Sequence, residues 1–284
     1  TNPDNKYAFG SEKQAWNLLH RWICINPIAA ENSFRSAIGL AALSVKSTDE
    51  MVEERLEVLS PALTLTYSKP IVLSRSAFQY MYDVYGNTYL DAYNNIPHVG
   101  HSHPLVVEAG QRQMAKLNTN TRYLNDLLPE YANKLLSKFP DTLNRVFLVN
   151  SGSEASDLAI RIARTHSGHN NIMVMKHGYH GQTQTDIDIS DYKFSSKVGQ
   201  GQKDYIIKAV IPDTYRGKYT GDNGSAGKAY AQEALDQIID SDEPIAAFIS
   251  EPILGCAGQV PLASGYLQEI YPAIRQQGGL CISD

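Results

Sequence analysis

Short apolar runs alternate with segments of helical periodicity along the second half of the chain. The pattern predicts two kinds of element: strands at 146–149, 172–175, 205–211, 246–250 and 280–283, and helices at 154–164, 229–239 and 266–276. Strands that are continuous apolar runs between helices are typical of a parallel sheet covered on both faces. We therefore expect an α/β domain built on a mostly parallel sheet with helices on both faces.

Residues 70–93 follow a different pattern. They alternate between apolar and polar positions and turn at Gly86, which predicts a β-hairpin. Two helical patterns follow, and Pro104 and Pro129 stand at their beginnings, where the first turn of a helix tolerates proline.

The ends of the chain predict its domain organisation. Apolar residues recur at helical spacing in the first 45 residues, and a polar stretch follows that suits a linker with a short helix. We expect three parts: a helical segment at 1–45, which resembles the tail of an upstream module; a linker and small-domain segment with the hairpin at 46–105; and part of a large domain at 106–284. Because the chain opens without Met and closes inside an apolar strand, we interpret it as a fragment truncated at its carboxyl end.

The composition narrows the class of protein. The 284 residues are 43% hydrophobic and 19% charged, as in ordinary soluble proteins, and no run of about 18 apolar residues predicts a membrane span. A net charge of −5 with scattered basic residues argues against a nucleic-acid partner. Cys24, Cys256 and Cys281 are odd in number and far apart, which indicates reduced thiols in a cytoplasmic protein.

The joint between the apolar run at 146–149 and the following helix is built from the small residues Ser151, Gly152 and Ser153. A helix N-terminus offers unpaired N–H groups and the positive end of a dipole, which together favour a phosphate group. The alternative is a simple helix cap, with Ser153 as the capping residue and Glu154 in the first turn. The sequence lacks the Gly-Lys-Ser/Thr of a nucleotide P-loop, the Gly-x-Ser-x-Gly of a hydrolase and the glycine spacing of a dinucleotide site.

Polar residues follow the other predicted strands at their carboxyl ends. His177-Gly178-Tyr179-His180-Gly181 follows 172–175, Glu251 follows 246–250, and Asp284 follows 280–283. Ligands of open parallel sheets bind beyond these ends. A phosphate cradle, an aromatic ring between glycines and two carboxylates would suit a flat, phosphorylated ring that contains nitrogen.

The motifs "NSGSEASDLAIR", "YHG", "SEP" and the terminal "SD" resemble the class III aminotransferases, pyridoxal-phosphate enzymes of fold type I, over roughly residues 60–284. The resemblance implies pyridoxal 5′-phosphate as cofactor, no metal, and a fold type I large domain preceded by a small-domain segment. The residues that it implies for cofactor binding are Ser151, Gly152, Ser153, Tyr179, His180, Glu251 and Asp284.

The same resemblance implies a role for each of these positions. Gly152 and Ser153 would hold the cofactor phosphate, and Tyr179 would stack on the ring. Asp284 would pair with the protonated ring nitrogen and keep the ring an electron sink. Glu251 would lie near the ring and the catalytic machinery, so Asp284 and Glu251 are the catalytic candidates.

The motifs "NNIPHVGHSHPLVVEA", "LNTNTRYL", "IDISDYKF" and "PDTYRGKY" resemble one branch of this family, which includes ethanolamine-phosphate phospho-lyase and phosphohydroxylysine phospho-lyase. This branch implies a small-molecule amine substrate, elimination of phosphate, and a homodimer in the full-length parent. The chain departs from the sequence pattern of this branch at Ser156, where Asn is common, and in the segment "LGCAGQ" after Glu251. Both departures make the assignment of the substrate less specific. The alternatives are a class III omega-aminotransferase with a keto-acid acceptor and a non-catalytic truncated segment.

The family's Schiff-base lysine is expected downstream of Asp284. The lysines at 176, 193, 203, 208 and 218 do not match its motif, and we interpret them as solvated surface charges. The chain is therefore expected to be inactive by itself.

Two further groups of residues need an interpretation. His98, His101 and His103 have no cysteine or carboxylate near them in sequence, so we interpret them as part of a loop that enters a helix, not as a metal site. Arg122 and Arg216 are candidates to bind a substrate phosphate, because Arg offers bidentate geometry to phosphate oxygens. The alternative for each is a structural pair, with Asp126 or with Asp213.

Overall fold

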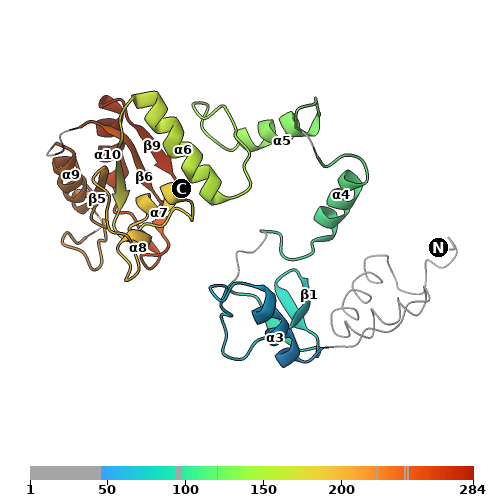
Figure 1. Cartoon of the computed structure of the whole chain (residues 1–284). Helices are drawn as coiled ribbons and strands as arrows, with labels where there is room; N and C mark the ends of the chain where they lie inside the picture. Colours follow the sequence, from blue (N-terminus) through green and yellow to red (C-terminus); the bar gives the residue numbers. More distant parts are fainter. Residues whose placement is uncertain (1–45, 94–97, 120, 222, 240, 242) are drawn as a thin grey trace. The chain divides into compact units, whose positions relative to one another are not determined.

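The computed structural model describes residues 46–284 except 94–97, 120, 222, 240 and 242. The chain divides into two compact units, Thr1–Asp126 and Leu127–Asp284 (Figure 1). The helices predicted within the first 45 residues lie outside the described residues, and the predicted domain boundaries stay predictions. Within the described part of the chain, no helix is long and apolar enough to cross a membrane.

The first unit holds a small antiparallel sheet. Among its described residues, the elements are α3 (Thr48–Val58), β1 (Leu73–Ala77), β2 (Tyr80–Asp83), β3 (Thr88–Leu90) and α4 (Pro104–Met114), with strand order β1-β2-β3. The predicted turn at Gly86 is confirmed. Buried Asp83 fixes it by accepting hydrogen bonds from the backbone N–H groups of Tyr85 (2.9 Å) and Asn87 (2.8 Å).

The second unit contains a parallel sheet with strand order β5-β4-β6-β9. The strands are β4 (Asn171–Met175), β5 (Ile206–Ala209), β6 (Ile245–Ser250) and β9 (Leu280–Ser283); the helices are α5 (Leu127–Leu136), α6 (Gly152–Ser167), α7 (Gln184–Ile189), α8 (Asp191–Phe194), α9 (Ser225–Ile239) and α10 (Tyr266–Gln276). A two-stranded hairpin, β7 (Ile253–Leu254) and β8 (Val260–Pro261), follows β6. The predicted α/β class is confirmed.

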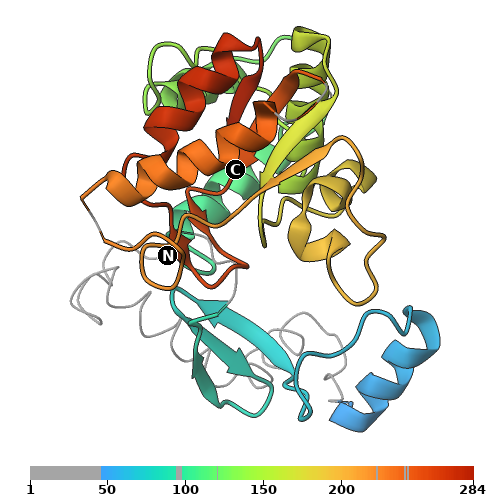
Figure 2. The same ribbon diagram turned by 90° about the vertical axis from the view of Figure 1, so that its left-hand side faces the viewer.

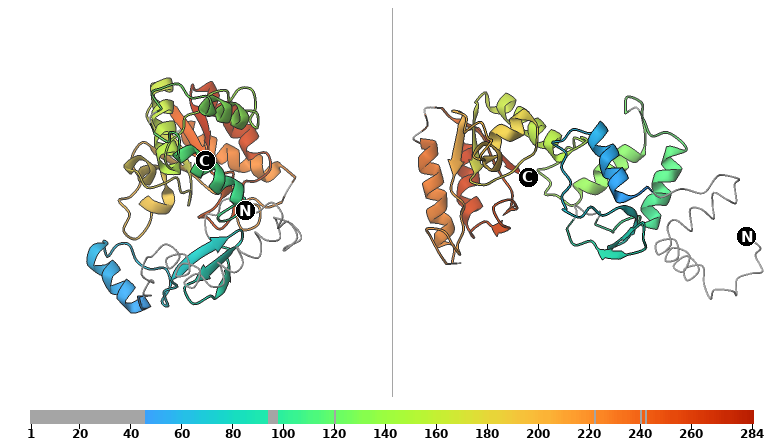
Figure 3. Two further views of the ribbon diagram at one scale, coloured as in Figure 1. Left: turned by 90° about the vertical axis from the view of Figure 1, so that its right-hand side faces the viewer. Right: turned by 60° about the horizontal axis from the view of Figure 1, so that its bottom comes forward.

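The sheet is buried on both faces. In β4, Met173 and Met175 belong to the apolar cluster formed with α9 and α10, whereas Ile172 and Val174 belong to the cluster formed with α6, α7 and α8. The two helices α9 and α10 lie together on one face in Figures 2 and 3. Successive side chains of a strand point to opposite faces, so two covered faces require apolar residues at every position. This requirement explains the continuous apolar runs.

The predicted strand at 146–149 is wrong. These residues form no strand, and Phe147 and Leu148 are 70% and 53% exposed. The physical reason is that an apolar run forms a strand only beside a partner, and none of the described strands pairs with it. The following helix is confirmed but begins earlier than predicted, at Gly152, because Ser151 and not Ser153 is the capping residue.

Two phenylalanines test this assignment. Phe248 belongs to β6, and its ring is completely buried against Tyr266 and Tyr271 of α10. Phe248→Ala should therefore lower the free energy of unfolding by about 3–5 kcal/mol. Phe147→Ala should change it by less than about 0.5 kcal/mol, because the ring is exposed. Urea unfolding of both variants measures the difference. A loss of stability in Phe147→Ala comparable with that in Phe248→Ala would show that 146–149 is packed in a core.

Candidate cofactor site

The segments predicted to form the site meet at the carboxyl edge of the parallel sheet. The start of α6 contacts the loop after β4, because the Ser153 hydroxyl accepts a hydrogen bond from the N–H of Gln182 (2.9 Å). The same loop contacts the end of β6, because the Tyr179 N–H donates to the Glu251 carboxylate (3.3 Å). These bonds join residues 29 and 72 positions apart in the sequence.

A third contact reaches the end of β9. The Nδ1 atom of His180 lies 2.7 Å from Oδ2 of Asp284, 104 positions away in the sequence. The imidazole of His180 is fully buried, and its Nε2 atom has no hydrogen-bond partner within the described part of the chain. The Asp284 carboxylate is 31% exposed, so His180 orients one of its oxygens while the group stays accessible.

The N-terminus of α6 has backbone donors without protein partners. Ser151 caps the helix by accepting from the N–H of Glu154 (3.1 Å). The N–H groups of Gly152 and Ser153 have no acceptor among the described residues. A Cβ added at Gly152 would meet nothing within 4 Å, so the packing of the chain itself does not require glycine there. Open N–H groups beside open space are what a phosphate needs at a helix N-terminus.

The Ser153 hydroxyl forms hydrogen bonds with other residues of the protein. It accepts from Gln182 and interacts with the carboxyl group of buried Asp186, which leaves the backbone N–H as the donor that Ser153 can offer a ligand. Gly181 makes this contact possible. Its φ is 131°, and an added Cβ would lie 2.5 Å from the Ser153 hydroxyl, so only glycine lets the loop approach α6.

The Tyr179 ring is held in a defined orientation. It meets Tyr192 edge to face, with ring centroids 6.0 Å apart, and its hydroxyl accepts from the side-chain amide of Gln182 (3.0 Å). The Nζ atom of Lys193 lies 5.4 Å from the ring centroid. The ring is half-buried, so it is fixed in place yet still accessible to a ligand.

The Glu251 carboxylate also binds backbone groups. Besides Tyr179, it accepts from the N–H of Gly255 (3.0 Å), so it ties the β7–β8 hairpin to the loop after β4. Its negative charge reaches Cys256: burial and then Glu251 raise the pKa of the Cys256 thiol, and Lys193 opposes them.

Two buried carboxylates behind the site differ in their environment. Burial raises the pKa of Asp186 although Thr183 donates hydrogen bonds to it, and the charge of Asp157 raises it further. Burial would also raise the pKa of Asp191, but hydrogen bonds from the Ser195 hydroxyl, the His177 N–H and the Lys208 ammonium together lower it.

The lysines are not all solvated surface charges. Lys208 forms an ion pair with buried Asp191 (3.0 Å), and Lys193 lies over the Tyr179 ring. Sequence reasoning thus missed the supporting roles of Asp191 and Lys193, although both belong to the "IDISDYKF" motif. Its resemblance to a family was the available signal, but the contacts themselves depend on the fold.

The two arginine candidates belong to different units of the chain. The Arg216 guanidinium is over the ring of Tyr215 (5.6 Å), and its backbone N–H donates to Asp213 (3.1 Å). No hydrogen bond or ion pair among the described residues joins Arg216 to the loop after β4. Arg122 belongs to the first unit.

Two of the histidine candidates, His101 and His103, have structural partners in the first unit. His101 binds the carboxylate of buried Asp91 (2.7 Å), and His103 meets the Phe78 ring edge to face. Asp91 is ten positions away in sequence, which is why local inspection missed this carboxylate. In the described part of the chain, no group of three or more His, Cys, Asp or Glu side chains has the geometry of a metal site.

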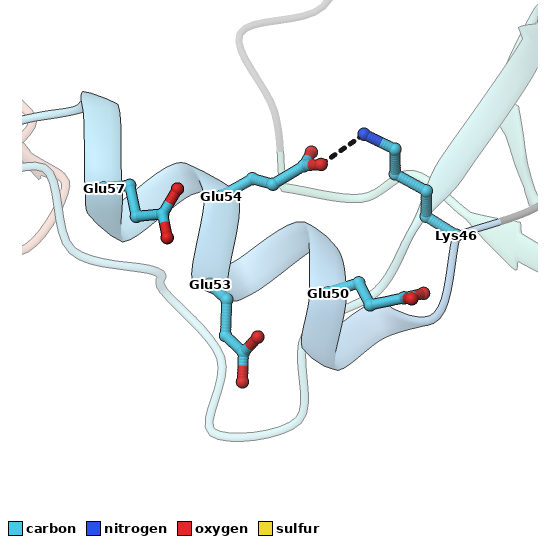
Figure 4. A pocket seen from close by; sticks show the side chains of 5 residues that line it. All are labelled: Lys46, Glu50, Glu53, Glu54 and Glu57. Carbon is cyan, nitrogen blue, oxygen red and sulfur yellow. Dashed lines mark hydrogen bonds and ion pairs between the residues drawn. The ribbon is translucent and has the colours of Figure 1, made fainter.

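The first unit has an acidic pocket on α3. Figure 4 shows it lined by Lys46 and by the glutamates at 50, 53, 54 and 57, with Lys46 paired to Glu54. Lys46 and Glu54 are more than half exposed, so the pocket is a solvated helix face.

The donor set at the sheet edge fits pyridoxal 5′-phosphate. Open N–H groups at the start of α6 match its phosphate, the Tyr179 ring matches its aromatic face, and the Asp284 carboxylate matches its ring nitrogen. The second carboxylate oxygen of Asp284, Oδ1, has no hydrogen-bond partner among the described residues, so it can accept from such a ring. The three features lie on segments that the hydrogen bonds above hold together.

Replacing Asp186 with Asn should change the pH dependence of stability. Because the pKa of Asp186 is raised in the folded state, this group favours folding below its unfolded pKa of about 3.9, and the advantage is lost as the pH rises through the folded pKa. Asp186→Asn should therefore become more stable relative to the unchanged chain as the pH rises above about 4. Urea unfolding at a series of pH values measures the difference; a relative loss of stability as the pH rises would contradict the expectation.

Comparisons with known proteins identify relatives of the chain. The chain is 41% identical over 254 residues to an alanine–glyoxylate aminotransferase 2-like protein from Drosophila melanogaster, covering 87% of this chain and 51% of that protein. It is 35% identical over 257 residues to ethanolamine-phosphate phospho-lyase homolog 1 from Caenorhabditis elegans, covering 86% and 55%. The chain thus spans about half the length of these relatives.

Solved structures show the same fold. A phospholyase from Arthrobacter in complex with phosphoethanolamine matches with a TM-score of 0.73 and 34% identity, over 82% of this chain and 55% of that one. A taurine:2-oxoglutarate aminotransferase from Bifidobacterium kashiwanohense, in complex with pyridoxal phosphate and glutamate, matches with a TM-score of 0.74 and 22% identity, over 85% and 56%.

The family match covers most of the chain. The model of aminotransferase class III matches residues 65–284, the same part of the chain in which the sequence motifs lie. The chain therefore belongs to the class III aminotransferases, and the cofactor of its family is pyridoxal 5′-phosphate.

Proposed function

We propose that this chain is the cofactor-binding part of a pyridoxal-phosphate enzyme that acts on a primary amine, and that the whole protein is a phospho-lyase which eliminates phosphate from ethanolamine phosphate or a similar phosphorylated amine. The observation that carries the proposal is the hydrogen-bonded cluster at the carboxyl edge of the sheet, where α6, Tyr179 and the His180–Asp284 pair meet. The 34% identity to a phospholyase in complex with phosphoethanolamine supports the substrate class.

The residues of the chain divide the work of binding. The N–H groups of Gly152 and Ser153 hold the cofactor phosphate at the positive end of the α6 dipole. The Tyr179 ring covers one face of the cofactor ring and excludes water from it, which adds roughly 0.5–1.5 kcal/mol beyond the burial of area. Asp284 accepts a hydrogen bond from the protonated ring nitrogen, and His180 keeps its carboxylate in the required orientation.

The cofactor supplies an electron sink for a carbanion at the amine-bearing carbon. The contribution of Asp284 is electrostatic: a carboxylate beside the ring nitrogen keeps that nitrogen protonated. Glu251 fixes the position of the loop after β4. One of its carboxylate oxygens accepts from the N–H of Tyr179 in that loop, and the other accepts from the N–H of Gly255 in the β7–β8 hairpin. Release of phosphate from the neighbouring carbon needs a cation in addition, and Arg122 and Arg216 are our candidates for it.

An aminotransferase with a keto-acid acceptor is the second candidate. The 41% identity to an alanine–glyoxylate aminotransferase 2-like protein favours it. Both reactions need the same cofactor contacts and the same proton removal, so they differ only in the groups that meet the leaving phosphate or the acceptor.

The remaining parts of the proposal concern the whole protein. A lysine that links to the cofactor is expected outside this chain, which makes the chain by itself inactive; a non-catalytic role is the alternative. We also propose a homodimer in the cytoplasm for the full-length parent.

The variant Gly152→Ala tests whether the N-terminus of α6 binds the cofactor phosphate or is only the beginning of a helix. Because a Cβ at this position meets nothing in the chain, stability should stay unchanged or rise by up to about 1 kcal/mol, as for Gly→Ala in helices. Binding of the cofactor phosphate should weaken, since a methyl group that enters an occupied site costs about 1–3 kcal/mol. Calorimetric titration with pyridoxine 5′-phosphate, which has no aldehyde to react with surface lysines, measures the affinity.

The control for this variant lies at the other end of α6. A Cβ added at Gly168 would also meet nothing within 4 Å, but the φ of this residue is 72°. Gly168→Ala should therefore lower the stability of the protein and leave its affinity for the phosphate unchanged. Equal affinities in Gly152→Ala and in the unchanged chain would remove the phosphate site from the start of α6.

Phosphate release distinguishes the two enzyme reactions. The whole protein with pyridoxal 5′-phosphate and ethanolamine phosphate, and without keto acid, should release inorganic phosphate over many turnovers. Arg122→Lys or Arg216→Lys should raise KM for the phosphorylated amine if that side chain binds the leaving group, because Lys loses the bidentate contact. Amine consumption that begins only after pyruvate or glyoxylate is added would instead identify an aminotransferase.

A further inference from the structure

The loop that carries Tyr179 and His180 begins with an unfavourable backbone conformation. His177, the first residue of the HGYH loop (His177–His180), has a φ of 61°, in the left-handed region that residues other than glycine rarely adopt. Such a conformation costs on the order of 1 kcal/mol and persists only where neighbouring groups hold it. The groups that hold it come from one short segment, Ser190–Lys193, which we call the SDYK segment.

The two ends of the HGYH loop bind the first two residues of the SDYK segment. The Ser190 hydroxyl accepts from the N–H of His180 (2.8 Å). The Asp191 carboxylate accepts from the N–H of His177 (2.7 Å). Both acceptors are side chains that are almost completely buried. The backbone at each end of the loop is therefore fixed by a buried hydrogen bond to an adjacent residue.

The middle of the loop binds the next two residues. The N–H of Tyr192 donates to the carbonyl of Gly178 (3.1 Å), and its ring meets the Tyr179 ring edge to face. The ammonium of Lys193 lies over the Tyr179 ring. Four consecutive residues thus contact all four residues of the loop, so the SDYK segment acts on the loop as a unit.

Asp191 links this pair of segments to the sheet. Its Oδ1 atom accepts from Ser195 Oγ (2.6 Å) and Lys208 Nζ (3.0 Å), and Lys208 belongs to β5. Its Oδ2 atom accepts from His177, whose imidazole Nδ1 is 3.6 Å away. A hydrogen bond to an ionised acceptor is about twice as strong as a neutral one. The carboxylate therefore holds the loop in a fixed position relative to β5.

We propose that Asp191 is a positioning residue for the cofactor site: through the N–H of His177 it sets the HGYH loop so that Tyr179 meets the cofactor ring and His180 orients Asp284. This inference rests on the proposed function, because Tyr179 and Asp284 bind a cofactor only if that proposal holds. A purely structural role for Asp191 would lower stability but leave the affinity of the folded protein and the His180–Asp284 contact unchanged.

Three variants separate these roles. Asp191→Ala removes the acceptor at one end of the loop, and Ser190→Ala removes the acceptor at the other end. Ser195→Ala is the matched control, because it removes a donor to the same carboxylate without touching the loop. Each is titrated with pyridoxine 5′-phosphate well below its unfolding temperature. We expect roughly tenfold weaker binding for the first two, equivalent to about 1.4 kcal/mol, and a change of less than about twofold for the control.

A second measurement reports on the loop without any ligand. The nitrogen resonances of the His180 imidazole, observed by ¹⁵N–¹H NMR, depend on its hydrogen bond to Asp284. They should shift in Asp191→Ala and in Ser190→Ala and stay in place in Ser195→Ala. Unchanged resonances and unchanged affinity in the two loop variants would overturn the proposal.

The two proposals fail in different ways. If the unchanged chain does not bind pyridoxine 5′-phosphate, the proposed cofactor site fails, whereas the His180 resonances still test the positioning role. If Asp191→Ala does not fold, Asp191→Asn decides the outcome, because it keeps the volume of the side chain but removes the charge that strengthens the hydrogen bond from His177: the same weaker binding and shifted His180 resonances would support the proposal, and no change in either would overturn it.

Discussion

Parallel pairing of β4, β6 and β9 is the constraint on which the rest of the second unit depends. Parallel strands end at the same edge of a sheet, so the residues that follow them are brought together however far apart they lie in the sequence. Tyr179, Glu251 and Asp284 follow three such strands and share one hydrogen-bonded cluster. The apolar clusters on both faces fix the strands, and the strands fix the cluster.

The cluster is held mainly by hydrogen bonds to backbone groups. Glu251, Ser190 and Asp191 each accept a backbone N–H of the loop after β4, and the Ser153 hydroxyl accepts the N–H of Gln182. Side chains that fix a backbone in this way leave the Tyr179 ring and one oxygen of Asp284 available to a ligand. Gly181 also helps to position this loop, because the absence of a Cβ lets the loop lie against α6.

Asp186 and Asp191 show how partners decide the behaviour of a buried carboxylate. Both are almost inaccessible to solvent, and burial by itself raises the pKa of each. Asp191 has an ammonium group and two further donors, so its pKa is lowered and it remains a charged anchor. Asp186 has only neutral donors, from Thr183 and Ser153, and a like charge at Asp157, so its pKa is raised. The charged anchor lies beneath the HGYH loop, whereas Asp186 lies beside the proposed phosphate site, where a second negative charge would be unfavourable.

Local patterns in the sequence were sufficient for most elements of the second unit. The bounds of α10 and β9 agree with those predicted, because hydrophobic periodicity records which face of a helix or strand is covered. The positions of the proposed site residues at the ends of β4, β6 and β9 were also predictable, since a polar residue soon after a buried strand is a local signal; their roles stay predictions. The family followed from the same motifs.

Only the tertiary structure decided which groups meet. The apolar run at 146–149 has the composition of a strand, yet it is exposed, because a strand needs a partner that the run itself does not encode. Likewise, the contact of His180 with Asp284 and that of Asp191 with Lys208 join residues from different strands and loops. Periodicity is a property of a few neighbouring residues, whereas a hydrogen bond across the sheet depends on the register of strands far apart in the chain, and that register exists only once the chain is folded.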